Sequence, residues 1–248
     1  MSRQQSLSKE VALELISYTE RPYKMLSSLV VNSVVSVLFF LGSYWLGSYN
    51  PQLLPVAAAT ILFWTLADIS ICNQFVFDKH RAMQSLTVNG SLQRFLFVKN
   101  ISVAIVSVPL TLLFGLLLVA VVGKWSEIVY GMVLAFTLIW GWLGISNTLS
   151  VLIPFELLDF KSYAQTRSAW LSYGFLYVLP WILLPVYAIV MGLPFILLGW
   201  TKANAASEHR LVSIAVLFAL SIIIWLAGLR VANRNLAHPD NRVKRLLQ

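Results

Sequence analysis

Charged side chains are scarce in this chain. Asp, Glu, Lys and Arg together make up 11% of its 248 residues, whereas soluble domains average roughly 25%. Hydrophobic residues make up 58%, which is more apolar surface than a soluble domain of this size can bury. We therefore expect lipid to be the solvent for most of the chain. The 12 Gly and 9 Pro residues follow no period, which excludes a collagen-like or linker-like chain.

Residues that carry chemistry are equally scarce. Cys72 is the only cysteine, so a disulfide framework and a cysteine-rich metal site are excluded. The three histidines, His80, His209 and His238, are expected on different sides of the membrane. The chain contains no G-x-x-x-x-G-K-[ST] phosphate loop, no H-E-x-x-H and no G-x-S-x-G. We expect no enzyme activity, no cofactor or metal bound by this chain, and no nucleic-acid partner.

Long runs without charge are abundant. A spanning helix needs about 20 apolar residues, and the first charge-free run is long enough for two spans separated by the turn-like stretch from Gly47 to Gln52. The sequence predicts one all-α membrane domain over residues 1–248, with six spans at 27–47, 53–73, 101–122, 128–150, 170–190 and 211–231. Residues 192–200 would form a short external or re-entrant segment, which protein must cover.

Lys and Arg divide unevenly between the two sides of this arrangement. With six spans, 15 of the 18 fall on the side that holds both termini. Because cytoplasmic loops are enriched in Lys and Arg, both termini are expected in the cytoplasm, with the chain in a cell inner or cytoplasmic membrane. A seventh span would move the basic tail, residues 234–248, to the outside, so we reject it.

The segment before the first span, residues 1–25, has a helical pattern. Leu7, Val11, Leu15 and Tyr18 recur at helical spacing, and charged residues lie elsewhere on the helical wheel. This pattern predicts an amphipathic helix at the inner membrane interface. A frayed polar terminus is the alternative. Pro22 is expected to end or kink the helix just before the first span.

Few polar residues fall inside the predicted spans. Asp68 is the only acidic one, and an intramembrane carboxylate is a candidate proton or ion site. Its position near the inner end of the second span favours simple hydration through the interface. Asn32 and Asn147 are expected to make interhelical hydrogen bonds rather than to bind a ligand.

The loop from Asn73 to Asn100 combines basic residues with aromatic ones. It is helical in pattern and is broken once, at Asn89-Gly90. Apolar anchors among charges favour a short helix pair that is offered to a cytosolic partner, and extension of spans two and three into the cytosol is the alternative. The candidate contact residues are Phe77, Asp78, Lys79, Arg81, Leu86, Ser91, Phe95 and Lys99.

Two segments resemble the permease family of ABC type-2 exporters. The first supplies Asn73, Phe77-Asp78-Lys79, Leu86, the turn Asn89-Gly90-Ser91 and then Lys99-Asn100; the family often has Pro where Gly90 stands here. The second runs from Gly144 through Asn147 and Ser150 to Pro154 and is similar to the end of span four in these permeases. The helix before span one, the six spans and an external hairpin after span five are also features of the family.

The resemblance implies a half-transporter. Two such subunits, identical or different, would enclose a path through the lipid bilayer, and separate ABC ATPase subunits would bind ATP and Mg and drive it. The loop from Phe77 to Lys99 and the N-terminal helix would receive the ATPase. Three alternatives stay open: a proton-coupled secondary transporter using Asp68, an integral-membrane enzyme, and a non-transporting membrane assembly subunit.

Overall fold

The computed structural model describes residues 6–19, 24–46, 72, 74–89, 92–122, 125–154, 178–180, 182–183, 185–187, 189–194, 197–199, 206–237 and 243. Within these residues the chain is helical and has no β strand, so the expected all-α class is confirmed for the described part. The helices are α1 (Leu7–Thr19), α2 (Lys24–Trp45), α5 (Gln74–Phe77), α6 (Lys79–Asn89), α7 (Leu92–Val122), α8 (Trp125–Leu152) and α11 (Ser207–Ala237). Short helical pieces also lie between residues 178 and 194.

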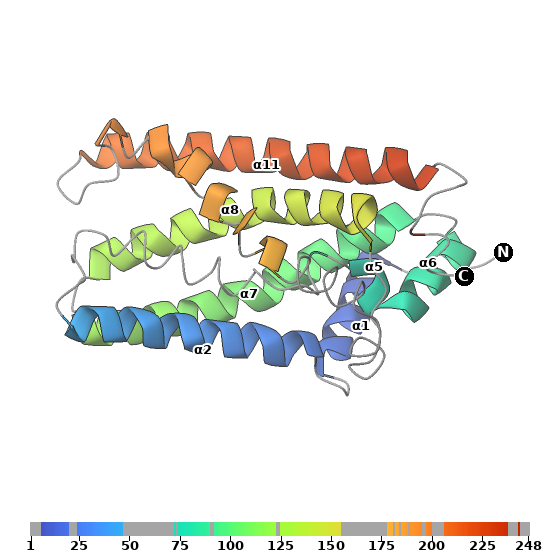
Figure 1. The fold of residues 1–248 in the computed structure, drawn as a ribbon, viewed down its shortest axis with the longest axis horizontal. Coiled ribbons are helices and arrows are strands. Elements are labelled where there is room, and N and C mark those ends of the chain that lie inside the picture. The colour runs from blue at the N-terminus through green and yellow to red at the C-terminus, as the bar shows by residue number, and fades with distance from the viewer. Residues whose placement is uncertain are drawn as a thin grey trace.

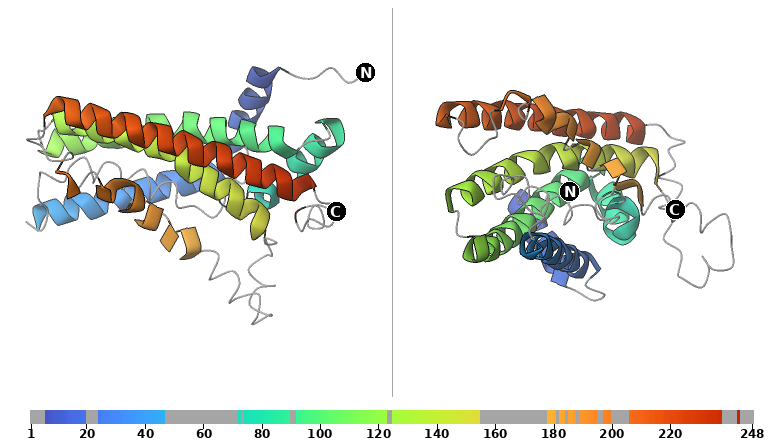
Figure 2. Two further views of the ribbon diagram at one scale, coloured as in Figure 1. Left: turned by 90° about the horizontal axis from the view of Figure 1, so that it is seen from above. Right: turned by 60° about the vertical axis from the view of Figure 1, so that its left-hand side comes forward.

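The four long helices run along the long axis of the molecule in the order α11, α8, α7 and α2 (Figure 1). The three short helices α1, α5 and α6 gather at one end, which we call the α6 end. Figure 2 shows the same grouping from two other directions. The chain enters α2 and α7 from the α6 end and leaves α8 and α11 there (Figure 1). Helix ends that the sequence assigns to one side of the membrane therefore lie together.

Three of the described helices contain a stretch long and apolar enough to cross a membrane. These stretches are Leu92–Leu110 in α7, Val129–Leu152 in α8 and Ser207–Ala237 in α11, and they indicate a multi-pass membrane protein. Helices α8 and α11 contain the predicted spans 128–150 and 211–231 in full. Helix α2 contains the predicted span 27–47 except for its last two residues. The predicted span 53–73 lies outside the described residues except for Cys72, and the span 170–190 is described only in pieces from residue 178 on.

Helix α7 begins nine residues before the predicted third span. It starts at Leu92, whereas the span was predicted from residue 101, so the second half of the loop is an extension of the third span, which the sequence offered as an alternative. At about 1.5 Å per residue, its 31 residues extend about 46 Å, which exceeds a hydrocarbon core of about 30 Å. The helix therefore carries the chain from the membrane to the α6 end without a break.

Helices α8 and α11 pack by direct backbone contact. A Cβ atom added to Gly228 would overlap the carbonyl oxygen of Gly144, and one added to Gly144 would lie 2.6 Å from the Cα of Trp225. Small residues at such a crossing let two membrane helices approach closely, and this gains van der Waals contact that lipid cannot replace. The buried residues of α11 follow this side of the helix: Ser213, Leu217, Ser221, Gly228, Leu229, Ala232 and Leu236.

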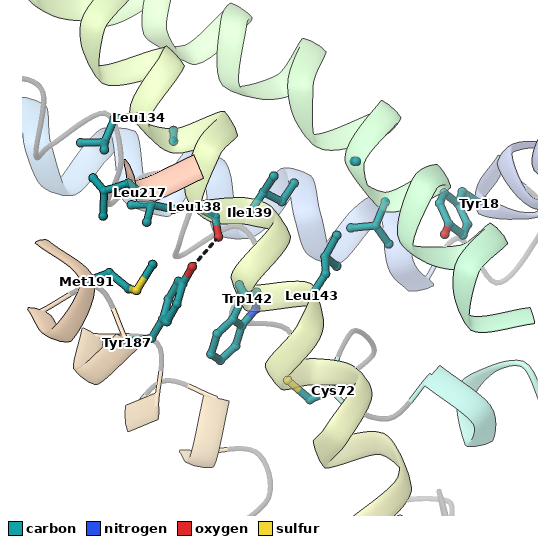
Figure 3. Close-up of a cluster of buried hydrophobic side chains, with 13 residues drawn as sticks. Tyr18, Cys72, Leu134, Leu138, Ile139, Trp142, Leu143, Tyr187, Met191 and Leu217 are labelled. Carbon is teal, nitrogen blue, oxygen red and sulfur yellow. Dashed lines mark hydrogen bonds between the residues drawn. The ribbon is translucent and has the colours of Figure 1, made fainter. Parts of the chain in front are cut away.

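Tyr187 ties the 178–194 segment to α8 and α11 (Figure 3). Its hydroxyl donates a hydrogen bond of 3.0 Å to the Leu138 carbonyl oxygen and lies 3.3 Å from Ser221 Oγ. A Cβ atom at Gly141 would collide with the tyrosine ring, so the glycine makes room for the ring. Hence Tyr187 joins three segments that are far apart in the sequence.

We expect the substitution Tyr187→Phe to lower the free energy of unfolding by about 0.5–1.5 kcal/mol, because it removes these hydrogen bonds and keeps the ring. Titration with SDS in mixed micelles would measure the loss. Ser213→Ala is a matched control on α11, because the Ser213 hydroxyl bonds only the carbonyl oxygen of His209 in its own helix. A Tyr187→Phe protein as stable as the wild type would show that these hydrogen bonds do not stabilise the packing.

Candidate functional site

The α6 end contains an ionic cluster, by which we mean Glu10, Glu14, Asp78, Arg81, Arg94 and Lys99. Glu10 and Glu14 are four residues apart on α1, so both carboxylates lie on the face of that helix that packs on α7. Arg94 and Lys99 lie on the first turns of α7, which begins at Leu92. Asp78 occupies the turn between α5 and α6. The cluster thus joins α1, α6 and α7.

Lys99 is at the centre of the cluster. Its side chain is 1% exposed, forms an ion pair with the Asp78 carboxylate, and has its Nζ 3.8 Å from Glu14 Oε1. Glu14, whose side chain is 5% exposed, also accepts a hydrogen bond of 2.9 Å from Arg81. Burying a charge without a partner is strongly unfavourable. Lys99 and Glu14 are therefore buried next to each other and next to their partners Asp78 and Arg81, and neither buried charge would be stable without a partner.

A further ion pair, between Arg94 and Glu10, lies closer to the surface. Arg94 Nε donates to Glu10 Oε2 at 2.8 Å, with both side chains partly exposed. Exposed pairs of this kind contribute little to stability, typically less than about 1 kcal/mol. We therefore assign most of the stabilising effect of the cluster to Lys99 and Glu14.

Tyr18 lies at the inner edge of the ionic cluster. Burial raises the pKa of its phenol well above the usual value, and the neighbouring carboxylates of Glu14 and Asp78 raise it further. The hydroxyl therefore stays protonated and uncharged in the physiological pH range. Its ring joins a hydrophobic core that also includes Trp142 and Leu143 of α8 (Figure 3). Tyr18 thus connects α1 to the packed interior.

Next to the ionic cluster lies an amide cluster, by which we mean Gln74, Asn100 and Asn147. Gln74 Nε2 donates to Asn100 Oδ1 at 3.4 Å and to Asn147 Oδ1 at 3.3 Å, and all three residues are fully buried. The Gln74 backbone N–H also donates to Ser150 Oγ at 3.2 Å. These bonds join α5 to both α7 and α8. They bring Gln74 together with two residues that lie 26 and 73 positions away in the sequence.

The hydrogen bonding of the amide cluster is incomplete. In the described structure, Gln74 Oε1, Asn100 Nδ2 and Asn147 Nδ2 are buried and have no hydrogen-bond partner. A buried polar group in this condition costs about 1–3 kcal/mol. Apolar residues at these three positions would therefore be expected to give a more stable fold.

The structure divides the predicted contact residues of the loop into two groups. Asp78, Arg81 and Lys99 belong to the ionic cluster, and Phe95 is buried with its ring stacked on Phe75 at 5.7 Å. These four residues hold the loop against the rest of the chain, and the side chains of Asp78 and Arg81 stay partly exposed. The expected role of the loop as a partner contact stays a prediction. Lys79 is exposed. The side chains of Phe77 and Leu86, and the residue Ser91, lie outside what the structure describes.

The predicted apolar face of the N-terminal helix points inward. Tyr18 is buried, Val11 and Leu15 are half-buried, and only Leu7 of the four is exposed. Leu13 and Ile16 are exposed instead. Glu10 and Glu14 are among the charged residues that were expected elsewhere on the helical wheel, but both turn toward basic residues of α6 and α7. The expected interfacial position of the helix stays a prediction, now with Leu13 and Ile16 as its outward apolar side chains.

The predicted intramembrane polar residues have different positions. Asn147 accepts the interhelical hydrogen bond from Gln74. Asn32 is half-buried on α2. Asp68 lies outside the described residues, so its expected hydration stays a prediction. Among the described residues, no group of three or more His, Cys, Asp or Glu is arranged to hold a metal ion.

Sequence reasoning missed the roles of Glu10, Glu14 and Gln74. Two acidic residues four apart on a helix, next to a loop with four basic residues, were the available signal for the first two. Gln74 had no such signal, because its partners come from helices that are distant in the sequence.

Comparison of the chain with protein-family models, with curated proteins and with solved structures found no match.

Proposed function

We propose that this chain is the permease subunit of an ATP-driven ABC exporter in the cytoplasmic membrane. It would span the bilayer six times with both termini in the cytoplasm, dimerise with a second permease subunit, and be driven by a separate ATPase subunit that binds ATP and Mg. The uneven division of Lys and Arg supports this orientation. The likeness of residues 73–100 and 144–154 to exporter permeases supports the family.

The observation that carries the proposal is the attachment of α6. This helix is tied through Arg81 to Glu14 of α1, and the turn before it is tied through Asp78 to Lys99 of α7. Lys79, His80, Gln84 and Thr87 remain exposed on α6. A partner that pushes on this exposed face would move α1 and α7 with it. Because α7 is one continuous helix, the motion would reach the membrane interior.

The exposed face of α6 is expected to receive the ATPase. Reversing the charge at Lys79→Glu together with His80→Glu should leave insertion and folding unchanged, because neither side chain is buried. We expect the substrate-stimulated ATP hydrolysis of the complex to fall at least tenfold, since unfavourable charge at an interface can cost several kcal/mol. The measurement is ATPase activity of the detergent-purified complex of this chain with its Walker-motif ATPase.

Arg234→Glu is the matched control, because Arg234 is an exposed basic residue at the C-terminal end of α11, also at the α6 end. The control complex should hydrolyse ATP like the wild type. Equal activity of the Lys79→Glu/His80→Glu complex would show that α6 is not the ATPase contact. Failure of this chain to form a complex with any Walker-motif ATPase, together with transport that follows a proton gradient, would overturn the proposal in favour of a secondary transporter.

A further inference from the structure

The outward face of α11 is apolar along most of its length and becomes basic at the α6 end. Its exposed residues recur every three or four positions, so they lie on one side of the helix. In chain order they are Val216, Ala219, Ile223, Leu226, Ala227, Arg230 and Arg234. The apolar ones belong to a stretch long and apolar enough to cross a membrane, and little of that stretch is buried in the protein. Lipid is therefore the expected surrounding of this face as far as Ala227, and the two arginines lie where the apolar part ends.

Arg230 and Arg234 present positive charge directly beside this apolar surface. They are four positions apart, so their side chains leave α11 on the same side, about 6 Å apart along the helix axis. Both side chains are exposed, and no described acidic side chain forms an ion pair with either. The described acidic groups at the α6 end, those of Glu10, Glu14 and Asp78, are already paired within the ionic cluster.

The order of apolar and basic residues along α11 defines the matching partner. A guanidinium group binds a phosphate through two parallel N–H donors. Basic residues at the end of a spanning segment attract anionic lipids, which are concentrated in the cytoplasmic leaflet. An acidic protein surface would match Arg230 and Arg234 but would leave the apolar residues before them unmatched. An anionic phospholipid matches both parts, because its acyl chains lie along the apolar residues while its phosphate reaches the arginines.

From this arrangement we infer that the face of α11 formed by Ile223, Leu226, Ala227, Arg230 and Arg234 binds an anionic phospholipid, with the phosphate held between the two arginines. The inference goes beyond the proposed function, because it concerns α11 and not the ATPase contact on α6. Only the assignment of the lipid to the cytoplasmic leaflet rests on the proposed orientation. Binding to the isolated chain does not depend on that orientation, so the two can fail separately.

The experiment adds dioleoyl phosphatidylglycerol to the purified full chain in uncharged detergent micelles, without ATP or a partner, and follows the midpoint of thermal unfolding. A ligand that binds the folded chain raises this midpoint. Dioleoyl phosphatidylcholine has the same tails with a head of no net charge, and glycerol 3-phosphate carries a phosphate without tails. We expect only dioleoyl phosphatidylglycerol to raise the midpoint, and about 0.5 M NaCl to reduce the shift. This comparison needs no variant of the chain.

Substitutions then locate the site. Arg230→Gln and Arg234→Gln should each raise the half-maximal phosphatidylglycerol concentration about fivefold, and the double variant should raise it at least about tenfold. The double variant Arg230→Lys/Arg234→Lys keeps both charges and should retain most of the affinity. Lys79→Gln is the matched control, because Lys79 is an exposed basic residue at the same end of the molecule but lies on α6. The control should bind the lipid like the wild type.

The inference has three ways to fail. An equal shift with phosphatidylcholine would show that the acyl chains alone bind, and an equal shift with glycerol 3-phosphate would show that the apolar face takes no part. The absence of any shift with phosphatidylglycerol would overturn the inference outright. Equal losses of affinity in Lys79→Gln and in the two arginine variants would also overturn it, because the lipid would then respond to the total charge of the chain and not to this face of α11.

Discussion

Replacing Lys99 with methionine is expected to lower the free energy of unfolding by about 3–5 kcal/mol, because a buried ion pair that loses one partner leaves an uncompensated charge. The lysine is 1% exposed and faces both Asp78 and Glu14. Methionine has a similar length and restores the apolar packing of the stem, so the loss reports the charge and not a cavity. SDS titration in mixed micelles would measure it, and hydrogen exchange would show α1 separating from α7.

Two further variants test the electrostatic origin of this loss. Lys79→Met is the matched control, since Lys79 belongs to the same loop but is exposed, and we expect a change within about 0.5 kcal/mol. Adding Asp78→Asn to Lys99→Met should recover part of the lost stability, because it removes the carboxylate that loses its partner, whereas Glu14 keeps its ion pair with Arg81. An additive or larger loss in the double variant would show that the charges do not act as one cluster.

The ionic cluster also explains why the predicted third span begins at residue 101 although α7 begins at Leu92. Charges were read as marks of the water phase, and Arg94 and Lys99 moved the expected start of the span to residue 101. In the structure, Glu10 neutralises Arg94, and Glu14 with Asp78 neutralises Lys99. These partners lie on α1 and in the turn before α6. The sequence pattern of one segment does not show that its charged residues form ion pairs with residues of a distant segment.

The hydrophobic runs were sufficient to predict α2, α8 and α11, because spanning length and apolar content are local properties. The break predicted at Asn89-Gly90 rested on an equally local signal, and α6 ends at Asn89 as expected. The inward face of α1 was not predictable, because a helical wheel gives the relative directions of side chains and not which direction faces the protein. Glu14 and Tyr18 share a side of α1 with Val11, and packing on α7 decided which groups were buried.

The amide cluster shows the same limit at the level of the site. Asn147 was expected to bond another helix, since a lone amide in a span must find a partner. Its partner, Gln74, comes from the segment after the second span, and Asn100 completes the group from α7. Each of the three residues is unremarkable in its own segment. The group exists only after α5, α7 and α8 pack together.

Replacing Gly228 with leucine is expected to separate α8 from α11 and to abolish the native packing of the bundle. Even the first added carbon would overlap the Gly144 carbonyl oxygen, which is backbone and cannot rotate away. Relief requires the helices to move apart, and this removes the contacts along α11 from Ser213 to Leu236. We expect a loss of more than about 3 kcal/mol, at the upper end of overpacking in a core.

The free energy of unfolding in mixed micelles would again be the measurement, and cross-linking of cysteines introduced on α8 and α11 would report the helix separation. Ala227→Leu is the matched control, because Ala227 is the exposed neighbour of Gly228 on the same helix and its side chain faces away from α8. The control should insert and pack like the wild type. Gly228→Ala should give an intermediate loss, since one methyl group demands a smaller displacement than a leucine side chain. If Gly228→Leu were as stable as Ala227→Leu, the two helices would not be in backbone contact at this crossing.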